Sequence, residues 1–433
     1  MAIGVGLLGL GTVGAGVAAI LTSPEGRHPL VAALELRRVA VRDPGRARPL
    51  ALDPAIVGTD AEAVVDDPGV EIVVEVIGGL EPARSLILRA IAAGKSVVTA
   101  NKAVMARHGE EIAAAAAARG VYVLIEAAVG GGIPVIEPLK QSLGGNRIQR
   151  LSGIINGTTN YILSRMAAEG ADYAAVLADA QQLGYAEADP AADVQGGDAA
   201  DKIAILAGLA FGGPVPRAAI PTEGIDRLEA RDVAYAAQLG YVVKLLAVAE
   251  RVGSTTEADQ LDVRVHPTLL PRQHPLAGVN GVNNAILVEG DPVGQVMFYG
   301  PGAGAGPTAS AVVADILNIA GIRQVGGGAS ALDPLLAASS WRRCALVDSR
   351  LTCHRNYVRF QTTDQPGVIG RIGTCFGEAG VSIQSIVQLE SQAGGAEIVV
   401  ITHEVLEERF QQALAALQAL PEVRAVAACL RTL

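Results

Sequence analysis

The amino-acid sequence predicts an α/β protein with a doubly wound parallel sheet, a second α+β domain, and a C-terminal βαββαβ domain of the ferredoxin-like type. Three observations lead to this fold class. Apolar strands alternate with helices over residues 1–130, extended segments separated by turns dominate residues 131–320, and residues 353–433 show the strand–helix–strand pattern twice. With 433 residues, the chain is long enough for two to four domains that each bury a core.

Residues 1–130 alternate between apolar strands and helical segments. Such alternation is typical of a parallel sheet with helices on both faces, and ligands bind at the carboxyl ends of its strands. The expected strands are Val5–Leu8, Arg38–Val41, Ile72–Val76, Ser96–Thr99 and Tyr122–Glu126, and the expected helices include Glu81–Ala93 and Gly109–Arg119.

Three glycines directly follow the first strand and precede an apolar helix. Gly9 allows a tight turn, Gly11 lets the backbone approach a pyrophosphate, and Gly14 allows the helix to pack closely on the strand. The structural alternative is an ordinary glycine-rich turn. The strand before and the helix after favour a Rossmann-type dinucleotide site with the phosphates at the helix N-terminus.

The second strand ends beside groups that bear on the choice of cofactor. Asp43 could hold a ribose hydroxyl, whereas Arg42, Arg46 and Arg48 could neutralise a 2′-phosphate. The arginines follow the strand closely, so we expect NADP, with NAD as the alternative.

Lys102 lies just beyond the strand Ser96–Thr99, at the edge of the sheet where ligands bind. It is therefore a candidate site residue. The alternative is a lysine that opens a surface helix.

The segment from Tyr185 to Lys202 concentrates acids around one lysine. Asp198 and Lys202 are four residues apart at the start of an expected helix, so both project from one face. An ammonium beside acids can donate a proton to an oxygen while carboxylates hold a cationic amine. The alternative is a solvated surface ion pair. The acids expected to converge are Asp179, Glu187, Asp189, Asp193, Asp198 and Asp201.

Residues 131–320 predict a mostly antiparallel sheet with helices on one face. A glycine-rich loop, Gly300–Thr308, then opens a helix that we expect to complete the first domain over residues 305–320. The expected helices are Ile133–Leu143, Asp172–Leu183 and Ala309–Ile319, and the expected strands are Arg150–Ile155, Tyr241–Glu250, Gln260–Leu269 and Ala285–Glu289.

A polar connection over residues 321–352 leads to the last domain, 353–433. In that domain the turn Asp364–Val368 could bind a small amino acid or could be a structural helix cap. The expected elements are strand Tyr357–Gln361, helix Pro366–Ala379, strands Val381–Leu389 and Ala396–Thr402, helix Leu406–Ala419 and strand Val423–Cys429.

Composition narrows the class of partner. The net charge of −10 and the aromatic content of 3% argue against nucleic acid. No apolar run approaches the roughly twenty residues of a membrane span, and no signal-type segment opens the chain, so we expect a cytoplasmic protein without membrane contact. The four cysteines lack Cys-x-x-Cys spacing, which favours reduced thiols over a zinc site.

Taken together, the motifs resemble those of homoserine dehydrogenases with a C-terminal ACT domain, across essentially the full length. No aspartokinase region precedes residue 1, so the resemblance is to the monofunctional form. The matching motifs are Gly9–Gly14, Thr99–Lys102, Glu126–Pro134, Asn156–Thr158, Gly184–Pro190, Gly197–Lys202 and Gly302–Thr308.

The resemblance implies reversible, NAD(P)H-dependent reduction of L-aspartate 4-semialdehyde to L-homoserine in threonine and methionine biosynthesis. It implies that Lys202 donates the proton, that Lys102 is a second catalytic candidate, and that the ACT domain senses threonine. It also implies a homodimer or homotetramer and a monovalent cation, expected to be sodium, held largely by backbone carbonyls. The implied substrate residues are Glu187, Asp198, Asp193, Gly157, Thr158 and Tyr185; the cofactor residues are Gly9, Gly11, Thr12, Val13, Gly14, Arg42, Ile77, Thr99, Lys102 and Gly304; and the cation residues are Glu126, Val129, Gly131 and Ile133.

The sequence disfavours two other functions, a cysteine-dependent aldehyde dehydrogenase and a non-catalytic amino-acid sensor. Dehydrogenases that oxidise an aldehyde through a cysteine thioester need a thiol in the catalytic part, but no cysteine occurs before Cys344. A non-catalytic amino-acid sensor would not need the glycine fingerprint together with Asp198 and Lys202. Both alternatives are therefore disfavoured.

Overall fold

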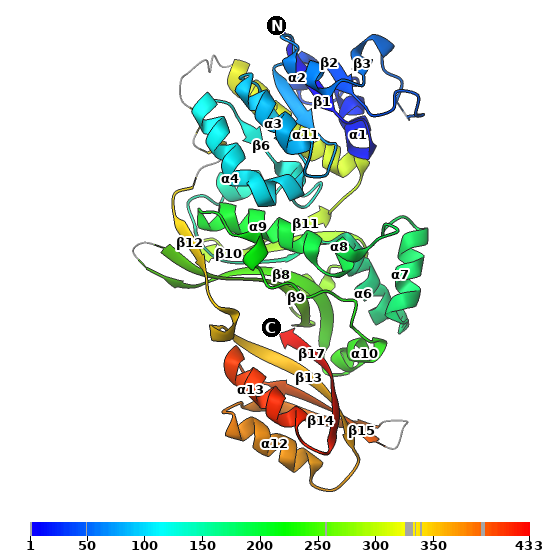
Figure 1. The fold of residues 1–433 in the computed structure, drawn as a ribbon, viewed down its shortest axis with the longest axis vertical. Helices are drawn as coiled ribbons and strands as arrows, with labels where there is room; N and C mark the ends of the chain where they lie inside the picture. The colour runs from blue at the N-terminus through cyan, green and yellow to red at the C-terminus, as the bar shows by residue number, and fades with distance from the viewer. Residues whose placement is uncertain are drawn as a thin grey trace.

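The computed structural model describes residues 2–433 except 49, 256–257, 325–331, 334, 338–339 and 391–394. Figure 1 shows three regions stacked along the long axis. The N-terminus lies at one end, and the C-terminus lies where the second region meets the third. The N-terminal region therefore lies at one end of the molecule and the C-terminal βαββαβ region at the other.

The N-terminal region forms a six-stranded parallel sheet in the order β3-β2-β1-β4-β5-β6. The side chains of β1 and β4 are buried on both faces, as expected for a parallel sheet covered by helices. The strand order reverses between β1 and β4, and this switch point is where such sheets bind ligands. The strands are β1 (Ile3–Leu8), β2 (Leu34–Ala40), β3 (Val57–Gly58), β4 (Ile72–Glu75), β5 (Ser96–Thr99) and β6 (Val123–Leu124).

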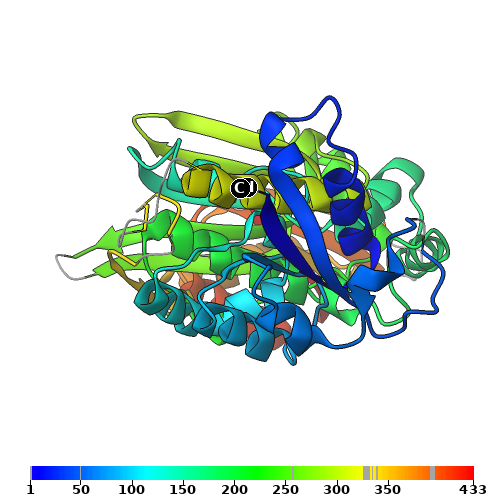
Figure 2. The ribbon, with the colours of Figure 1, turned by 90° about the horizontal axis from the view of Figure 1, so that it is seen from above.

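Helices cover both faces of this sheet (Figure 2). On one face α1 (Thr12–Leu21) packs against α11 (Ala305–Gln324), which returns from far along the chain. On the other lie α2 (Ala61–Asp66), α3 (Ala83–Ala92) and α4 (Lys102–Arg119). Gly16 permits the close approach of α11, because a Cβ there would lie 2.8 Å from the carbonyl oxygen of Ala305.

One described helix, α11, is long and apolar enough to cross a membrane by length and composition alone. This corrects the expectation that no apolar run approaches that length. The reason is packing: α11 buries Ala309, Val312 and Ile316 in the core beneath the parallel sheet and carries a fully buried carboxylate, Asp315. A helix in the core of a folded domain can be equally long and apolar.

The second region contributes five strands to an eleven-stranded sheet. Its helices pack on one face of those strands and enclose the main hydrophobic core. The strands, in sheet order, are β11 (Gly294–Pro301), β10 (Asn283–Asp291), β7 (Arg147–Ile154), β8 (Tyr241–Ser254) and β9 (Ala258–Pro271). The helices are α5 (Ile136–Lys140), α6 (Gly157–Glu169), α7 (Tyr173–Gln182), α8 (Ala191–Val194), α9 (Gly197–Phe211) and α10 (Ala230–Gln238).

Several elements differ from the sequence-based expectation. The helix predicted over Ile133–Leu143 is only α5, and α4 begins at Lys102 rather than Gly109 because Asn101 caps it, accepting the amide of Val104 at 3.2 Å. The sequence did not predict α6, α10 or β11. In β11 the burial pattern alternates between exposed and half-buried residues, which leaves no apolar run to recognise.

The third region has the expected βαββαβ order, and its strands continue the large sheet as β17-β13-β15-β14. β17 pairs in parallel with β9, so the two regions share one sheet. Its elements are β13 (Cys353–Thr363), α12 (Val368–Glu378), β14 (Ile383–Glu390), β15 (Gly395–Thr402), the short β16 (Val405–Leu406), α13 (Glu407–Gln418) and β17 (Val423–Thr432).

The segment 321–352 is more than the polar connection that the sequence predicted. Its start completes α11, and β12 (Arg343–Leu346) pairs in parallel with β9. Residues 325–331, 334 and 338–339 of this segment lie outside the described residues. The four cysteines of the chain form no disulfide with one another.

Candidate functional site

The glycine turn between β1 and α1 has the backbone that its sequence requires. Gly9 has φ of +101°, in the region that favours glycine, and its amide donates to Ala40 at 2.9 Å. A Cβ on Gly14 would lie 2.1 Å from the carbonyl oxygen of Gly9, so any side chain there would collide with the turn. A Cβ on Gly11 would meet nothing within 4 Å. Gly11 therefore borders open space at the start of α1, where Thr12 is exposed and Val13 half-buried. These residues fit a dinucleotide pyrophosphate.

Other predicted cofactor residues lie along the same edge of the parallel sheet. Thr99 ends β5, and its hydroxyl donates to the fully buried Glu75 at 2.6 Å. The other oxygen of Glu75 accepts the amide of Ile77 at 2.9 Å. Glu75 therefore fixes both neighbours. The sequence reasoning missed this residue, although a carboxylate that ends a buried strand was a visible signal. Gly304, with φ of +123°, immediately precedes α11.

The groups after β2 differ in how freely they could meet a 2′-phosphate. Arg42 is exposed and has no ion-pair partner among the described residues. Arg48 donates instead to loop carbonyls, including that of Asp43 at 2.6 Å. The Asp43 carboxylate accepts the amide of Gly45 at 2.9 Å. Arg42 is thus the freer cation of the two.

Lys102 and Lys202 contact the same carboxylate, that of Asp198, where α4 of the first region meets α9 of the second; this contact between the two regions is called the seam. Lys102 begins α4 of the N-terminal region, and its Nζ lies 2.5 Å from Oδ1 of Asp198. Lys202 Nζ lies 2.8 Å from Oδ2 of the same residue. Asp198 and Lys202 lie four residues apart on α9, as their spacing predicted. The contact to Lys102 crosses between regions and was not visible in the spacing.

The ammonium of Lys202 is held in a fixed position. It donates to the carbonyl oxygen of Ile155 at 2.7 Å in addition to its contact with Asp198. The Lys202 side chain is 11% exposed, whereas that of Lys102 is 41% exposed. An ammonium has three N–H donors, so Lys202 keeps one donor for a further acceptor.

Electrostatics keep Asp198 ionised. Burial opposes its ionisation, but the adjacent ammonium groups of Lys202 and Lys102 outweigh burial and hold the pKa of Asp198 below its ordinary value. Burial also opposes the charge of Lys102, and the contact with Asp198 reverses this and raises the pKa of Lys102. Both partners are therefore charged at neutral pH.

A polar group beside this cluster links α6 to the acidic segment. Asn156 donates to Asp193 at 2.7 Å and to Asp198 at 3.0 Å, and it also caps α6 by accepting the amide of Thr159 at 2.9 Å. Thr158 donates to the carbonyl oxygen of Tyr185 at 2.7 Å. Burial raises the pKa of Asp193, and the hydrogen bond from Asn156 opposes this only in part. Asn156 was not among the predicted site residues, although its motif was visible.

Gly157, the first residue of α6, directly follows Asn156. A Cβ there would lie 2.8 Å from the carbonyl oxygen of Val282, so the backbone is closely covered. The ring of Tyr185 is 45% exposed and lies against that of Tyr161, with centroids 4.9 Å apart. Both predicted residues therefore border the polar group.

The six acids of the Tyr185–Lys202 neighbourhood do not all converge on Lys202, which corrects the sequence interpretation. Asp198 alone pairs with it, and Asp193 is linked through Asn156. Competing partners explain the rest: Asp179 pairs with Arg165, Asp189 caps its own turn, and Asp201 pairs with two arginines. Glu187 is exposed, and its backbone oxygen, not its carboxylate, accepts from Gln181 at 3.1 Å.

The predicted cation segment forms a tight loop against the glycine loop that precedes α11. Gly131 has φ of +56°, and a Cβ there would lie 2.4 Å from the carbonyl oxygen of Gly302. Among the described residues, no backbone or side-chain donor bonds the carbonyl oxygens of Val129, Gly131 or Ile133. Those oxygens remain free for a hard cation, which fits carbonyl ligation.

The side chain of Glu126 has a different task from its backbone. Its carboxylate accepts the amides of Val135, Ile136 and Glu137 at 2.6, 2.9 and 2.7 Å, and its own amide donates to Asp315 at 2.8 Å. Because these amides bond a side chain, α5 starts only at Ile136. Burial raises the pKa of both Glu126 and Asp315.

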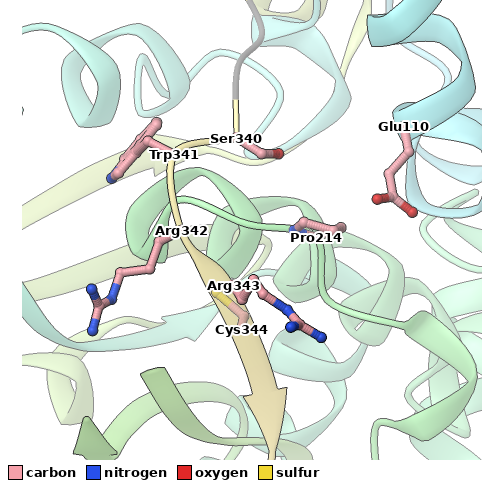
Figure 3. Close-up of a pocket in the computed structure, with 7 residues that line it drawn as sticks. All are labelled: Glu110, Pro214, Ser340, Trp341, Arg342, Arg343 and Cys344. Carbon is pink, nitrogen blue, oxygen red and sulfur yellow. The ribbon is translucent and has the colours of Figure 1, made fainter. Parts of the chain in front are cut away.

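A cavity of about 540 Å³ lies away from this cluster (Figure 3). Glu110 of α4 stands on one side of it, and the segment Ser340–Cys344 lies on the other. None of the predicted site residues lines it. Its size alone does not make it the reaction centre, because the convergent charges lie elsewhere.

The turn predicted to bind an amino acid in the third region is exposed. Asp364 accepts a hydrogen bond from Gln388 of β14 at 3.1 Å, and Gly367, with φ of +91°, caps α12. Asp364 thus precedes this eleven-residue helix, which begins at Val368.

Comparison with known proteins covers all three regions. Family profiles described as homoserine dehydrogenase, homoserine dehydrogenase NAD binding domain, and ACT domain match residues 134–317, 9–126 and 356–422. The chain is 58% identical over 434 residues to the homoserine dehydrogenase of Synechocystis sp., with 100% of both chains covered. It is 44% identical to that of Corynebacterium glutamicum, over 99% of this chain and 95% of that one.

Two solved structures are informative. The homoserine dehydrogenase of Thiobacillus denitrificans is similar with a TM-score of 0.89 and 42% identity, over 100% of this chain and 98% of that chain. A hyperthermophilic archaeal homoserine dehydrogenase in complex with NADPH has a TM-score of 0.59 and 27% identity, over 74% of this chain and 98% of that one.

Proposed function

Because the chain belongs to the homoserine dehydrogenase family, we propose that it reduces L-aspartate 4-semialdehyde reversibly to L-homoserine at the Lys102–Asp198–Lys202 cluster, with Lys202 as the proton donor. The observation that carries this assignment is the fixed ammonium of Lys202. Two acceptors hold it at 2.7 and 2.8 Å, and the third N–H remains for the substrate's carbonyl oxygen.

A bound nicotinamide cofactor supplies the hydride that reduces the aldehyde carbon. Negative charge then develops on the carbonyl oxygen, and the Lys202 ammonium stabilises it and transfers a proton to it. Asp198 and the carbonyl oxygen of Ile155 hold Lys202 oriented until it gives up this proton. Lys102, the more exposed ammonium, adds positive charge on the cofactor side of the same carboxylate.

Substrate recognition follows from the remaining polar groups. Asp193 and Asp198 provide the charges that attract the substrate's amine, and Asn156 holds both carboxylates in place. Gly157, Thr158 and Tyr185 border the same space. Glu187 belongs to the proposal by resemblance to the family, and its carboxylate is exposed in this structure.

We assign NADP as the preferred cofactor. Arg42 is exposed and unpaired within the described chain at the end of β2, and a related archaeal structure contains NADPH. We expect Arg42→Ala to raise KM for NADPH about tenfold or more, the loss of one charge-assisted phosphate contact, and to leave KM for NADH unchanged. An equal effect on both cofactors would contradict the preference.

The proposal includes a sodium ion at the carbonyl oxygens of Glu126, Val129, Gly131 and Ile133. The free carbonyls of this loop and its contact with the loop before Gly304 support it. Replacing sodium by a large organic cation such as tetramethylammonium should lower activity, and re-adding sodium should restore it. Full activity without any alkali cation would remove this part.

Regulation and assembly complete the proposal. Asp364 would hold the ammonium of threonine and the N-terminus of α12 its carboxylate, and bound threonine would inhibit the enzyme. The chain would act as a homodimer or homotetramer in the cytoplasm. The exposed edge strand β11, with Tyr299 55% exposed, is a surface that a second copy would cover. Light scattering gives the mass, and the rate with millimolar threonine, compared between wild type and Asp364→Ala, tests the regulation.

The decisive experiment compares Lys202→Ala and Lys102→Ala with the wild type. We measure NADPH oxidation with aspartate semialdehyde, homoserine-dependent NADP reduction at alkaline pH, and NADPH affinity. Loss of a general acid costs about a hundredfold or more in kcat, so Lys202→Ala should lose at least that while its NADPH affinity stays normal. A larger loss in Lys102→Ala would exchange the two roles. An inactive wild type would overturn the proposed activity.

A further inference from the structure

A second ion pair crosses the seam between the first two regions, away from the reacting groups. Helix α4 of the dinucleotide-binding region lies directly over α9 of the second region (Figure 1). Arg107 of α4 reaches across with Nη1 3.0 Å from Oδ2 of Asp201 on α9. The seam therefore carries two pairs on the same two helices, Lys102–Asp198 and Arg107–Asp201.

Asp201 is already held by its own region before Arg107 meets it. Arg217, which follows α9, donates from Nε to Oδ1 of Asp201 at 2.7 Å and from Nη2 to the carbonyl oxygen of Gly197 at 3.3 Å. Each carboxylate oxygen of Asp201 thus has an arginine partner, and its side chain is only 10% exposed. Arg217 therefore fixes the Asp201 carboxylate in a position to receive Arg107, and both of its oxygens are engaged by arginines.

The two pairs across the seam differ in what substrate does to them. Asp198 is a proposed ligand of the substrate's amine, so substrate competes with Lys102 for it. The Arg107–Asp201 pair faces no such competitor. It can therefore hold α4 against α9 while Lys102 is released from Asp198.

The pair acts at a fixed distance from the chemistry. Arg107 is five residues beyond Lys102 on α4, about 1.4 turns or roughly 7.5 Å along the helix axis. Asp201 is adjacent to Lys202 in sequence. A shift of α4 relative to α9 therefore moves the cofactor edge relative to the Lys202 ammonium. Misplacement of reacting groups by about 1 Å can cost as much as a hundredfold in rate.

We propose that Arg107, held by Asp201 and Arg217, is a positioning residue that keeps the cofactor-binding region in register with Lys202 during reduction. The inference rests on the proposed role of Lys202. Because Arg107 is 41% exposed, the pair adds little to overall stability. Its effect belongs to the ternary complex, where both regions must meet, and not to NADPH binding, which needs only the first region.

The test is a kinetic comparison of Arg107→Gln, Arg107→Lys and the wild-type full-length chain. We expect Arg107→Gln to lower kcat with aspartate semialdehyde about five- to tenfold, with unchanged NADPH affinity and an unchanged melting temperature. Arg107→Lys keeps the charge and should recover at least half of the lost rate. Asp201→Asn, which weakens the receptor, should give a loss of similar size.

The matched control is Glu111→Gln. Glu111 lies on the same helix and pairs with Arg84 at 2.5 Å, but both residues belong to the dinucleotide-binding region. This variant should keep the wild-type kcat. A kcat of Arg107→Gln within twofold of the wild type, or an equal loss in Glu111→Gln, would overturn the positioning role. An inactive wild type would instead overturn the proposed activity, so the two failures are distinguishable.

Discussion

The strongest stability prediction concerns the buried arginine that joins the ACT domain to the catalytic region. Arg359 of β13 is fully buried and contacts the fully buried Asp232 of α10 at 2.7 and 3.1 Å. Its remaining partners are Glu397 at 3.0 Å and Glu229 at 3.1 Å. We predict that Arg359→Met loosens the docking of the two regions.

The magnitude follows from what each carboxylate keeps. Glu397 retains Arg231 at 2.8 Å and the Tyr235 hydroxyl at 2.6 Å, and Glu229 is half-exposed and becomes hydrated. Asp232 retains only longer contacts, the Tyr357 hydroxyl at 3.4 Å and the Glu229 amide at 3.3 Å. An uncompensated buried carboxylate costs about 3–5 kcal/mol.

Hydrogen exchange of the β13 amides measures this cost directly, because it reports the free energy of local opening. About 3–5 kcal/mol corresponds to exchange faster by roughly two to four orders of magnitude. The double variant Arg359→Met with Asp232→Asn should recover most of the protection, because neither partner is then left charged and alone. Arg350→Met, which breaks the exposed pair with Asp348, is the control and should change nothing measurable.

A loss below about 1 kcal/mol in Arg359→Met, or no recovery in the double variant, would refute this reasoning. The first result would mean that Asp232 finds water or another partner. The second would mean that the cavity left by the arginine, not the unpaired charge, dominates the cost.

Three further predictions concern the cofactor turn, a buried lysine and the substrate acids. Gly11→Ala should keep the melting temperature but weaken NADPH binding about tenfold or more. Gly14→Ala should instead destabilise the turn itself, since its Cβ would lie 2.1 Å from the Gly9 oxygen. Calorimetry measures the loss of stability, and NADPH titration measures the loss of binding. Burial lowers the pKa of Lys244 from 10.5 to about 8, so between these pH values the unfolded chain binds more protons than the folded chain and stability rises with pH. In denaturant unfolding across that pH range, the wild type should gain about 3 kcal/mol of stability relative to Lys244→Met. If the stabilities of the two proteins change with pH in parallel, the effect is contradicted. Because burial raises the pKa of Asp193, kcat/KM should fall as the pH drops through that raised value. The pH–rate profile of Asp193→Asn should lack this decrease at acidic pH. The same decrease in both enzymes would mean that another group causes it.

Much of the fold could be predicted because local patterns determine it. The strand expected at Ser96–Thr99 has the same bounds in the structure, and the glycine turn has the backbone expected of Gly9 and Gly14. The βαββαβ order was also predictable, since each of its helices shows one apolar face. Periodicity along the chain was sufficient for all of these.

The missed elements depend on contacts that are distant in sequence. The expected helix from Ile133 shortens to α5 because the Glu126 carboxylate takes the amides that would have joined the preceding turn. The joining of two regions into one sheet rests on the pairing of β17 with β9, which no local pattern encodes. The capped helix after Asn156 was readable in principle, because asparagine is a strong helix cap, but the sequence interpretation used Asn156–Thr158 only as a family motif and expected no helix there.

The site shows the same division between local and distant information. The i,i+4 spacing of Asp198 and Lys202 predicted their contact, and the end of β5 predicted where Lys102 would lie. Spacing could not predict that both lysines would share Asp198, because α4 and α9 meet only when two domains pack. Nor could it predict that arginines elsewhere would draw Asp179 and Asp201 away from Lys202.

In the proposed mechanism, this sharing of Asp198 explains why the reaction needs both regions together. One carboxylate beside two ammonium groups leaves a net positive charge, which favours the negative oxygen that forms during reduction. The half-buried Asp193 nearby moderates that charge and, in the proposed function, offers a place for the substrate's amine. If the two regions separated, Lys202 would keep its contact with Asp198. The cluster would lose Lys102 and, with it, the edge of the parallel sheet where the cofactor is expected to bind. The Lys102–Asp198 pair therefore contributes both to the contact between the regions and to the charge beside Lys202, while Arg107–Asp201 contributes to the contact alone, so a variant that separates α4 from α9 should lose rate before it loses fold.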